Sequence, residues 1–222
     1  MGELAIAARV EVLVLVDNVT NSLSNAPEFV ENEFRRFWRR GGRILSGQCL
    51  CCAAHGLSCA ITAWRGDNAK TLLFDTGPDA TVFQRNVGRL EFDMGAVDGI
   101  VLSHGHWDHG GAMLRALEMI QMNNGGREVP TYMHPGMYKT RATRTPDGSM
   151  HLFDDVPSAA ALEKHGARVE HATEAQLILE DLFFVSGEIP RRHPCPSIAR
   201  RRSAHQRSGG SGSQPEPSSA RR

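Results

Sequence analysis

A short stretch of the chain concentrates four side chains of the kinds that bind metal ions. They are His104, His106, Asp108 and His109. An apolar run predicts a buried strand over 98–103 and a helical pattern begins after Gly111, so the four side chains lie at a strand end. Imidazole and carboxylate groups are ligands of Zn²⁺, Mn²⁺ and Fe²⁺. The spacing predicts that His104 and His106 hold one ion, and that Asp108 and His109 hold a second.

The competing interpretation is that each histidine is an ordinary hydrogen-bonded residue of the core. That interpretation explains a single histidine well, but here four ligand-type side chains fall within six positions. Gly105, Gly110 and Gly111 also leave room for a close backbone approach. We therefore favour a metal site over a structural role.

The run at 103–111 resembles the His-x-His-x-Asp-His signature of the metallo-β-lactamase superfamily. Further segments match in order along residues 10–192: Asp17 with Asn18, His-Gly-Leu-Ser at 55–58, Phe-Asp-Thr-Gly at 74–77, His134 with Pro135, and Ser-Gly-Glu-Ile-Pro-Arg at 186–191. Together they resemble the subfamily named for dihydropterin ribofuranosyl-aminobenzene phosphate synthase.

The resemblance implies a fold, a cofactor and a role for one more residue. The fold would be an α/β metallo-β-lactamase-like αββα sandwich, of which this chain holds the first half. The cofactor would be two divalent metal ions, zinc first, with manganese or iron as alternatives. Asp75 would lie beside the metals and orient a ligand, as carboxylates often do for metal-bound imidazoles. The alternative for Asp75 is a plain turn residue.

The ligand set is incomplete, because a catalytic zinc ordinarily has three protein ligands and this loop supplies two to each ion. In the superfamily the remaining ligands come from the second half of the sandwich. The glycine-cysteine-serine-histidine segment that carries the first of them is not found in this sequence. Nothing in the spacing of His151, His165, His171, His193 or His205 predicts a substitute.

The resemblance implies a metal-dependent hydrolase or transferase that acts on a small, phosphorylated, pterin-like molecule through a metal-bound hydroxide, with Asp75 and Asp108 as its catalytic carboxylates. His134 lies at the end of a predicted strand and either faces the substrate or the metals, or is a plain turn residue. Lys139, Arg141 and Arg144 either bind an anion or form a solvated face. Two alternatives remain: a truncated, catalytically impaired metal-binding fragment, and a nuclease whose basic tail holds phosphates.

Composition separates a folded part, 1–192, from a tail, 193–222. The chain has 222 residues, of which 41% are apolar and 23% charged, as in soluble globular proteins. The tail holds six arginines, one glutamate and a single long aliphatic residue, Ile198, so we expect it to be disordered. The folded part is mildly acidic, which speaks against a nucleic-acid-binding body. We expect a cytoplasmic protein with no membrane partner and leave its oligomeric state open.

Strands alternate with helices along the chain, which predicts a layered α/β fold. Strands are expected at 10–16, 57–64, 71–74, 130–135, 168–172 and 182–185, and helices at 78–89, after 111, and at 158–164. A further helix at 27–40 carries an aromatic stripe, which predicts packing in the core. The alternative is a flap over the active site.

Overall fold

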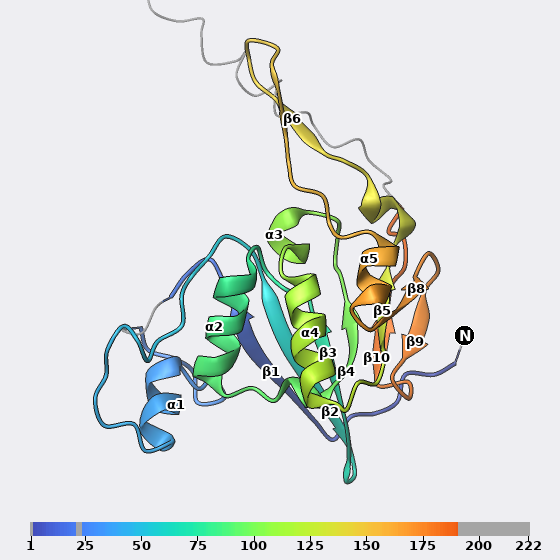
Figure 1. The fold of residues 1–222 in the computed structure, drawn as a ribbon. Coiled ribbons are helices and arrows are strands. Elements are labelled where there is room, and N and C mark those ends of the chain that lie inside the picture. Colours follow the sequence, from blue (N-terminus) through green and yellow to red (C-terminus); the bar gives the residue numbers. More distant parts are fainter. Residues whose placement is uncertain (1, 21–23, 191–222) are drawn as a thin grey trace, which may run out of the picture. The chain divides into compact units, whose positions relative to one another are not determined.

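A mixed six-stranded sheet forms the centre of the computed structural model, which describes residues 2–20 and 24–190 (Figure 1). The strands lie in the spatial order β1 (Arg9–Val16), β2 (Ser58–Arg65), β3 (Asn68–Phe74), β4 (Val97–Val101), β5 (Val129–Met133) and β8 (Ala167–His171). The first three strands are antiparallel neighbours, whereas β3, β4, β5 and β8 run parallel. The carboxyl ends of the parallel strands therefore meet at one edge of the sheet.

Helices cover one face of this sheet. They are α2 (Ala80–Leu90), α4 (Met113–Asn123) and α5 (Ala159–Lys164). The apolar stripes of α2 and α4 place Phe83, Met113 and Leu117 against Leu73 and Ile100, and all five side chains are fully buried. This crossover arrangement, strand then helix then parallel strand, is the one that buries both the sheet face and the helix stripes.

The opposite face of the sheet is covered in part by a small hairpin. It consists of β9 (Gln176–Ile178) and β10 (Phe183–Val185). Ile178 packs with Leu72, Val101 and Tyr132, which form a second apolar cluster. Val10, Val12 and Val14 of the edge strand β1 remain 45–58% exposed on this face. Among the described residues, the second β-layer is thus two strands wide.

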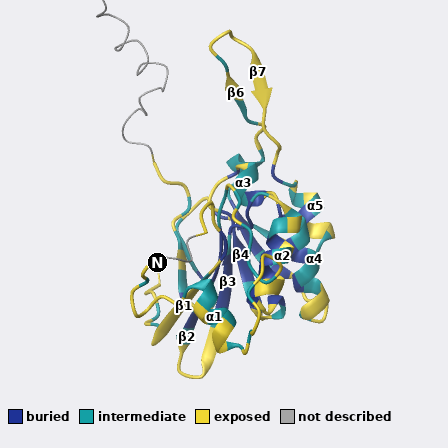
Figure 2. Ribbon diagram, turned by 90° about the vertical axis from the view of Figure 1, so that its left-hand side faces the viewer, coloured by how far each residue is buried: buried dark blue, intermediate teal, exposed yellow. Residues whose placement is uncertain are grey.

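A second hairpin projects from the body and was not expected from the sequence. It is made of β6 (Ala142–Arg144) and β7 (Met150–Leu152), and its residues are mostly exposed (Figure 2). The turn between its strands contains Pro146, Asp147 and Gly148, which are turn-forming residues. Short strands without an alternating apolar pattern give little sequence signal, and this explains why they were missed.

The predicted helix at 27–40 is shorter, and its expected packing in the core was wrong. Helix α1 spans Glu33–Arg39 and begins after Asn32, whose side chain accepts a hydrogen bond from the Arg35 amide. No residue of α1 is buried, and Phe29 before it is 89% exposed. The segment instead borders a groove of about 830 Å³ along β1. Aromatic residues have the same helical spacing in a helix that borders a groove as in a helix that packs in the core. The sequence pattern therefore did not distinguish the two.

The alternative for that segment, a flap over the active site, is also not what the structure shows. The Arg36 guanidinium donates to the carbonyl of Leu90, the last residue of α2. The residue before the start of α2, Asp79, follows Pro78, which contacts Gly111 beside the histidine loop. Helix α1 therefore lies at the end of α2 that is remote from that loop.

The α/β class is confirmed, and the remaining expected strands and helices are present with small shifts at their ends. No helix among the described residues has the length and apolar character needed to span a membrane. The compact unit of the fold is Met1–Glu188. The tail expected at 193–222 lies outside the described residues.

Candidate metal centre

The four predicted ligands lie on the loop that joins β4 to α4, at the edge where the parallel strands end. A single helical turn, α3 (Trp107–Gly110), forms the second part of this loop. His106 precedes α3 in an extended conformation, and Asp108 and His109 are part of it. Strand ends at this edge are where open α/β sheets usually carry ligand-binding side chains.

Asp75 follows β3 at the same edge and is held in an unusual backbone conformation. Its φ is +56°, which is a left-handed value, and the residue is fully buried. Its amide donates to the Val101 carbonyl at 2.9 Å, and its own carbonyl accepts from Ser58 Oγ at 2.9 Å. Strained conformations of non-glycine residues persist where neighbouring groups hold them, and they concentrate at functional sites.

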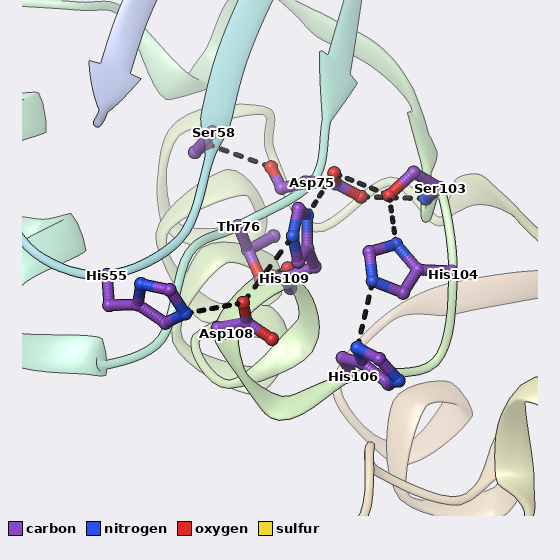
Figure 3. A network of polar contacts seen from close by, with 9 residues as sticks. All are labelled: His55, Ser58, Asp75, Thr76, Ser103, His104, His106, Asp108 and His109. Atoms are coloured by element: carbon purple, nitrogen blue, oxygen red, sulfur yellow. Dashed lines mark hydrogen bonds and ion pairs between the residues drawn. The ribbon is translucent and has the colours of Figure 1, made fainter. Parts of the chain in front are cut away.

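The carboxylate of Asp75 contacts two residues of the loop (Figure 3). Its Oδ1 accepts from the Ser103 amide at 2.7 Å, and its Oδ2 accepts from Ser103 Oγ at 2.7 Å. The same Oδ2 lies 2.7 Å from His109 Nδ1. Because a carboxylate only accepts hydrogen bonds, His109 carries its proton on Nδ1. The lone pair of a neutral His109 is then on Nε2.

The same reasoning assigns the proton on His104. Ser103 Oγ lies 3.0 Å from His104 Nδ1, and the one hydroxyl proton of Ser103 is already donated to Asp75. His104 Nδ1 is therefore the donor, and its Nε2 holds the lone pair. That Nε2 lies 3.1 Å from His106 Nδ1 (Figure 3).

The three imidazole rings lie close together. The ring of His104 is 4.5 Å from that of His106 and 4.2 Å from that of His109, between centroids. Burial lowers the pKa of His104 below its ordinary value, and the neighbouring His109 and His106 lower it further. A lowered pKa favours the neutral imidazole, which is the form that binds a metal.

Asp108 lies on the other side of His109. Its Oδ2 is 3.6 Å from His109 Nε2 and 3.5 Å from His55 Nε2 (Figure 3). His55 comes from the segment before β2 and was given no role by the sequence beyond its place in a matching segment. Its proximity to Asp108 depends on a contact between residues 53 positions apart, for which the spacing of residues gives no signal.

Backbone contacts hold the loop in place. The Thr76 amide donates to the His109 carbonyl at 2.8 Å, and the Ala112 amide donates to the Gly77 carbonyl at 3.3 Å. A Cβ atom on Gly105 would overlap the backbone of Met137, so the loop packs directly on the turn that follows β5. Only glycine allows an approach this close.

The donor atoms of this loop are arranged in pairs, and we compare their spacing with that of the ligands of one divalent cation. For a tetrahedral zinc with Zn–N distances of about 2.0–2.1 Å, two ligand nitrogens lie roughly 3.3–3.4 Å apart. The separation between His104 Nε2 and His106 Nδ1 is close to this value. Within the described part of the chain, no three His, Cys, Asp or Glu side chains are already arranged as one site. The described residues therefore offer donors in pairs and no complete ligand set for one cation.

His134 lies next to this loop, on the turn that follows β5. Its Nδ1 accepts from the Gly136 amide at 3.0 Å, and its Nε2 is 3.5 Å from a carboxylate oxygen of Glu188. Arg141 donates to three carbonyl groups, those of Gly136, Met137 and Lys139. The guanidinium of Arg141 is therefore engaged in holding this turn.

The segment that contains the histidine loop matches a known protein family. Residues 70–174 match the family model described as the beta-lactamase superfamily domain. This range contains Asp75 and the complete histidine loop. The match agrees with the resemblance to the metallo-β-lactamase superfamily that the sequence predicted.

One relative agrees with the predicted subfamily. It is the 7,8-dihydropterin-6-methyl-4-(beta-D-ribofuranosyl)-aminobenzene-5'-phosphate synthase of Methanocaldococcus jannaschii, which is 31% identical over 135 residues. The match covers 61% of this chain and 44% of the relative. The chain thus spans less than half of the length of this curated relative.

Solved structures with a similar fold include two metallo-β-lactamases. MEM-A1, a subclass B3 enzyme from a soil metagenome library, is 17% identical with a TM-score of 0.30, over 55% of this chain and 43% of that one. MIM-1 from Novosphingobium pentaromativorans is 22% identical with a TM-score of 0.32, over 55% of this chain and 42% of that one.

Proposed function

We propose that this chain forms a divalent-metal centre of a hydrolase or transferase that acts on a small phosphorylated molecule. The observation that carries the proposal is the Asp75 network, which fixes the tautomers of His104 and His109 so that both present a lone pair at Nε2. A purely structural cluster of histidines has no need of this arrangement, whereas a metal site does.

Each residue of the centre has a defined part in the proposal. His104 and His106 hold one cation, and Asp108 and His109 hold a second. Asp75 accepts a hydrogen bond from His109 Nδ1 and, through Ser103, orients His104. The bound cations would supply Lewis-acid polarisation of a carbonyl or phosphoryl oxygen and would acidify water.

Asp108 has a second proposed role, which is to position the nucleophile. Its Oδ2 faces the Nε2 atoms of two histidines, and its side chain is only 15% exposed. From this position the carboxylate accepts a hydrogen bond from the attacking water or hydroxyl and directs a lone pair of that nucleophile at the substrate. His134, on the adjacent turn, is the residue we assign to the substrate.

The substrate class rests on the relative from Methanocaldococcus jannaschii, whose name states a phosphorylated, pterin-linked product. A pterin-like molecule with a phosphate group is therefore the substrate we propose. Hydrolysis would transfer the cleaved group to water, and synthesis would transfer it to a second substrate.

A second candidate function is a metal-binding fragment without turnover. Two observations favour it: the chain spans 44% of the relative, and its donors are arranged in pairs. A catalytic zinc with only two protein ligands is held weakly. Such a fragment would need a further polypeptide to become active.

Metal content and phosphoester cleavage together separate these two functions. We expect the purified chain, dialysed against micromolar zinc and analysed by plasma mass spectrometry, to hold about two ions per chain. His104→Ala should lose at least one of them. His151→Ala, on the exposed hairpin strand β7, is the matched control and should keep both.

Retention of zinc with cleavage of a chromogenic phosphoester would support the enzyme. Retention of zinc without cleavage would support the fragment. A wild-type chain that holds no zinc under these conditions, or a His104→Ala variant that holds as much as wild type, would contradict the proposed metal centre.

A further inference from the structure

Strand β1 is an edge strand of the central sheet, and β2 is its neighbour on one side (Figure 1). In an antiparallel pair, alternate residues direct their amide and carbonyl groups away from the partner strand. Within the described part of the chain, the backbone of Val10–Val14 makes no hydrogen bond outside its pairing with β2. The edge closes at Leu15, whose carbonyl accepts from Asn86 at 2.8 Å. The outer side of β1 therefore presents unpaired donors and acceptors to a further strand.

This edge lines the groove of about 830 Å³ that α1 also borders. The lining contains all six residues from Val10 to Leu15, so the groove runs along the strand. It also contains residues 29–33, together with Arg36 and Arg39 of α1. Because a strand rises about 3.4 Å per residue, the six residues of β1 span roughly 20 Å. The groove therefore has the length of an extended peptide of about six to eight residues.

The side chains of β1 alternate between two chemical environments. Val10, Val12 and Val14 lie on the open face of the sheet and are 45–58% exposed. Glu11 points to the other face, because successive side chains of a strand point in opposite directions. An added strand has the same alternation, so one set of its side chains would lie beside the valines and the other set beside Glu11. Apolar side chains suit the first position.

The charges of the groove determine which side chains suit the second position. Its lining contains four carboxylates and two guanidinium groups, which gives a net charge of −2. These residues are Glu11, Asp17, Glu31, Glu33, Arg36 and Arg39. Both guanidinium groups are already engaged, by the Glu31 carboxylate and by the carbonyl of Leu90. The adjacent Arg9 pairs with Glu11, and the net charge is still −1 when Arg9 is included. Lysine or arginine therefore suits the second position.

We propose that the groove beside β1 binds an extended peptide of another protein, in which apolar side chains alternate with lysine or arginine. The peptide adds a further strand to the sheet at β1. Its main-chain hydrogen bonds supply affinity, and the alternation of its side chains supplies specificity. None of the four ligand-type side chains of the histidine loop lines this groove, so the inference goes beyond the proposed function and does not depend on it.

Fluorescence anisotropy tests the charge preference on the full chain. The probe is a labelled peptide of about eight residues, in which lysine and valine alternate. We expect saturable binding of this peptide and much weaker binding of the version with glutamate in place of lysine. Glu11→Lys should weaken binding roughly three- to tenfold, because it replaces an attraction between exposed charges by a repulsion. Glu128→Lys is the matched control, because Glu128 is exposed and does not line the groove.

Two N-methylated peptides test the main-chain hydrogen bonds. One is methylated at its valine amides and the other at its lysine amides, so each loses the donors of one edge without a change in charge. Only the peptide whose methylated edge faces β1 should bind more weakly, by more than about tenfold, because several hydrogen bonds are lost together. Hydrogen exchange then locates the peptide. Amides of β1 should become protected in the complex, and those of β8, at the opposite edge of the sheet, should not.

Equal binding by both methylated peptides, or by Glu11→Lys and wild type, would show attraction without strand addition and would overturn the inference. A dimer in sedimentation experiments, with β1 protected before any peptide is added, would also overturn it, because the occupant would then be a second copy of the chain. Zinc binding by Glu11→Lys should equal that of wild type, so failure of this inference leaves the proposed metal centre standing. Circular dichroism shows whether each variant is folded.

Discussion

At the scale of single residues, the buried carboxylate of Asp75 determines where the histidine protons lie. One of its oxygens accepts from Ser103 Oγ and from His109 Nδ1, each at 2.7 Å. Ser103 Oγ in turn accepts a hydrogen bond from His104 Nδ1. Two imidazoles are thus set in the tautomer that leaves the lone pair on Nε2. The motif predicts His104 and His109 as metal ligands, whereas the link through Ser103 could be found only in the structure.

Ser103→Ala should therefore weaken zinc binding at the pair formed by His104 and His106. Without the hydroxyl, nothing fixes the tautomer or the ring orientation of His104, and outer partners of this kind are worth about 10- to 100-fold in affinity. Calorimetric titration measures the change. Ser186→Ala, which removes an exposed hydroxyl, is the control, and equal losses in the two variants would contradict the role of Ser103.

Cys51 carries a prediction that concerns pH. Burial, followed by a hydrogen bond to Glu33, raises the pKa of the thiol from 9.0 to about 12. Alkylation of Cys51 at pH 8, followed by mass spectrometry, should be up to about a thousandfold slower in the folded chain than in urea, because only the thiolate reacts. Equal rates would contradict the burial of this thiol.

The raised pKa of Cys51 also determines how the free energy of unfolding depends on pH. A thiol whose pKa is raised on folding contributes stability that is present below pH 9 and is lost as the pH rises toward 12. The free energy of unfolding should fall over that range, and by less in Cys51→Ser.

At the scale of elements, the sequence predicted those whose pattern is enforced by burial. Strands β2 to β5 and helices α2 and α4 bury one face or both, so their apolar spacing was readable. Strand β1 was readable from its β-branched residues, although only Leu15 and Val16 of it are buried. Helix α1 has a similar aromatic spacing but borders a groove, and β6 and β7 have no buried face. The four-residue helix α3 was also missed, because a single turn leaves no periodic pattern. The apolar pattern therefore identified the buried elements, but at α1 it predicted a burial that the structure does not show.

Asn86 shows how one side chain can join elements. It is buried on α2, donates to the carbonyls of Leu15 and Cys52 at 2.8 and 2.9 Å, and accepts from the Cys52 amide at 2.8 Å. It therefore connects α2 to β1 and to the 49–54 segment.

Asn86→Leu should lower the free energy of unfolding by about 1–3 kcal/mol or more, because it leaves buried backbone groups unpaired. Urea denaturation measures the loss. Gln84→Ala, on the exposed side of the same helix, should change it by less than about 0.5 kcal/mol. Equal losses would contradict the connecting role of Asn86.

At the scale of the whole molecule, the described residues form a sheet with one face closed by helices and the other closed in part by β9 and β10. The histidine loop at 103–111 lies at the edge of the sheet where the parallel strands end. The ligands of a cation bound to this loop would be in place only in the folded state, so its binding should stabilise that state.

Zinc at about 100 times its dissociation constant should therefore raise the free energy of unfolding by about 2.7 kcal/mol. For a chain of this length that corresponds to a rise of roughly 5–10 °C in the melting temperature. Differential scanning calorimetry with zinc, and again after chelation, measures it. A melting temperature that does not respond to zinc would contradict tight binding to the folded state.

The proposed metal centre is tested most directly by anomalous diffraction at the zinc absorption edge, from crystals of this chain grown with zinc. We expect one peak between His104 Nε2 and His106 Nδ1 and another beside Asp108 Oδ2 and His109 Nε2. Zinc peaks elsewhere on the chain, with none at these four side chains, would contradict it.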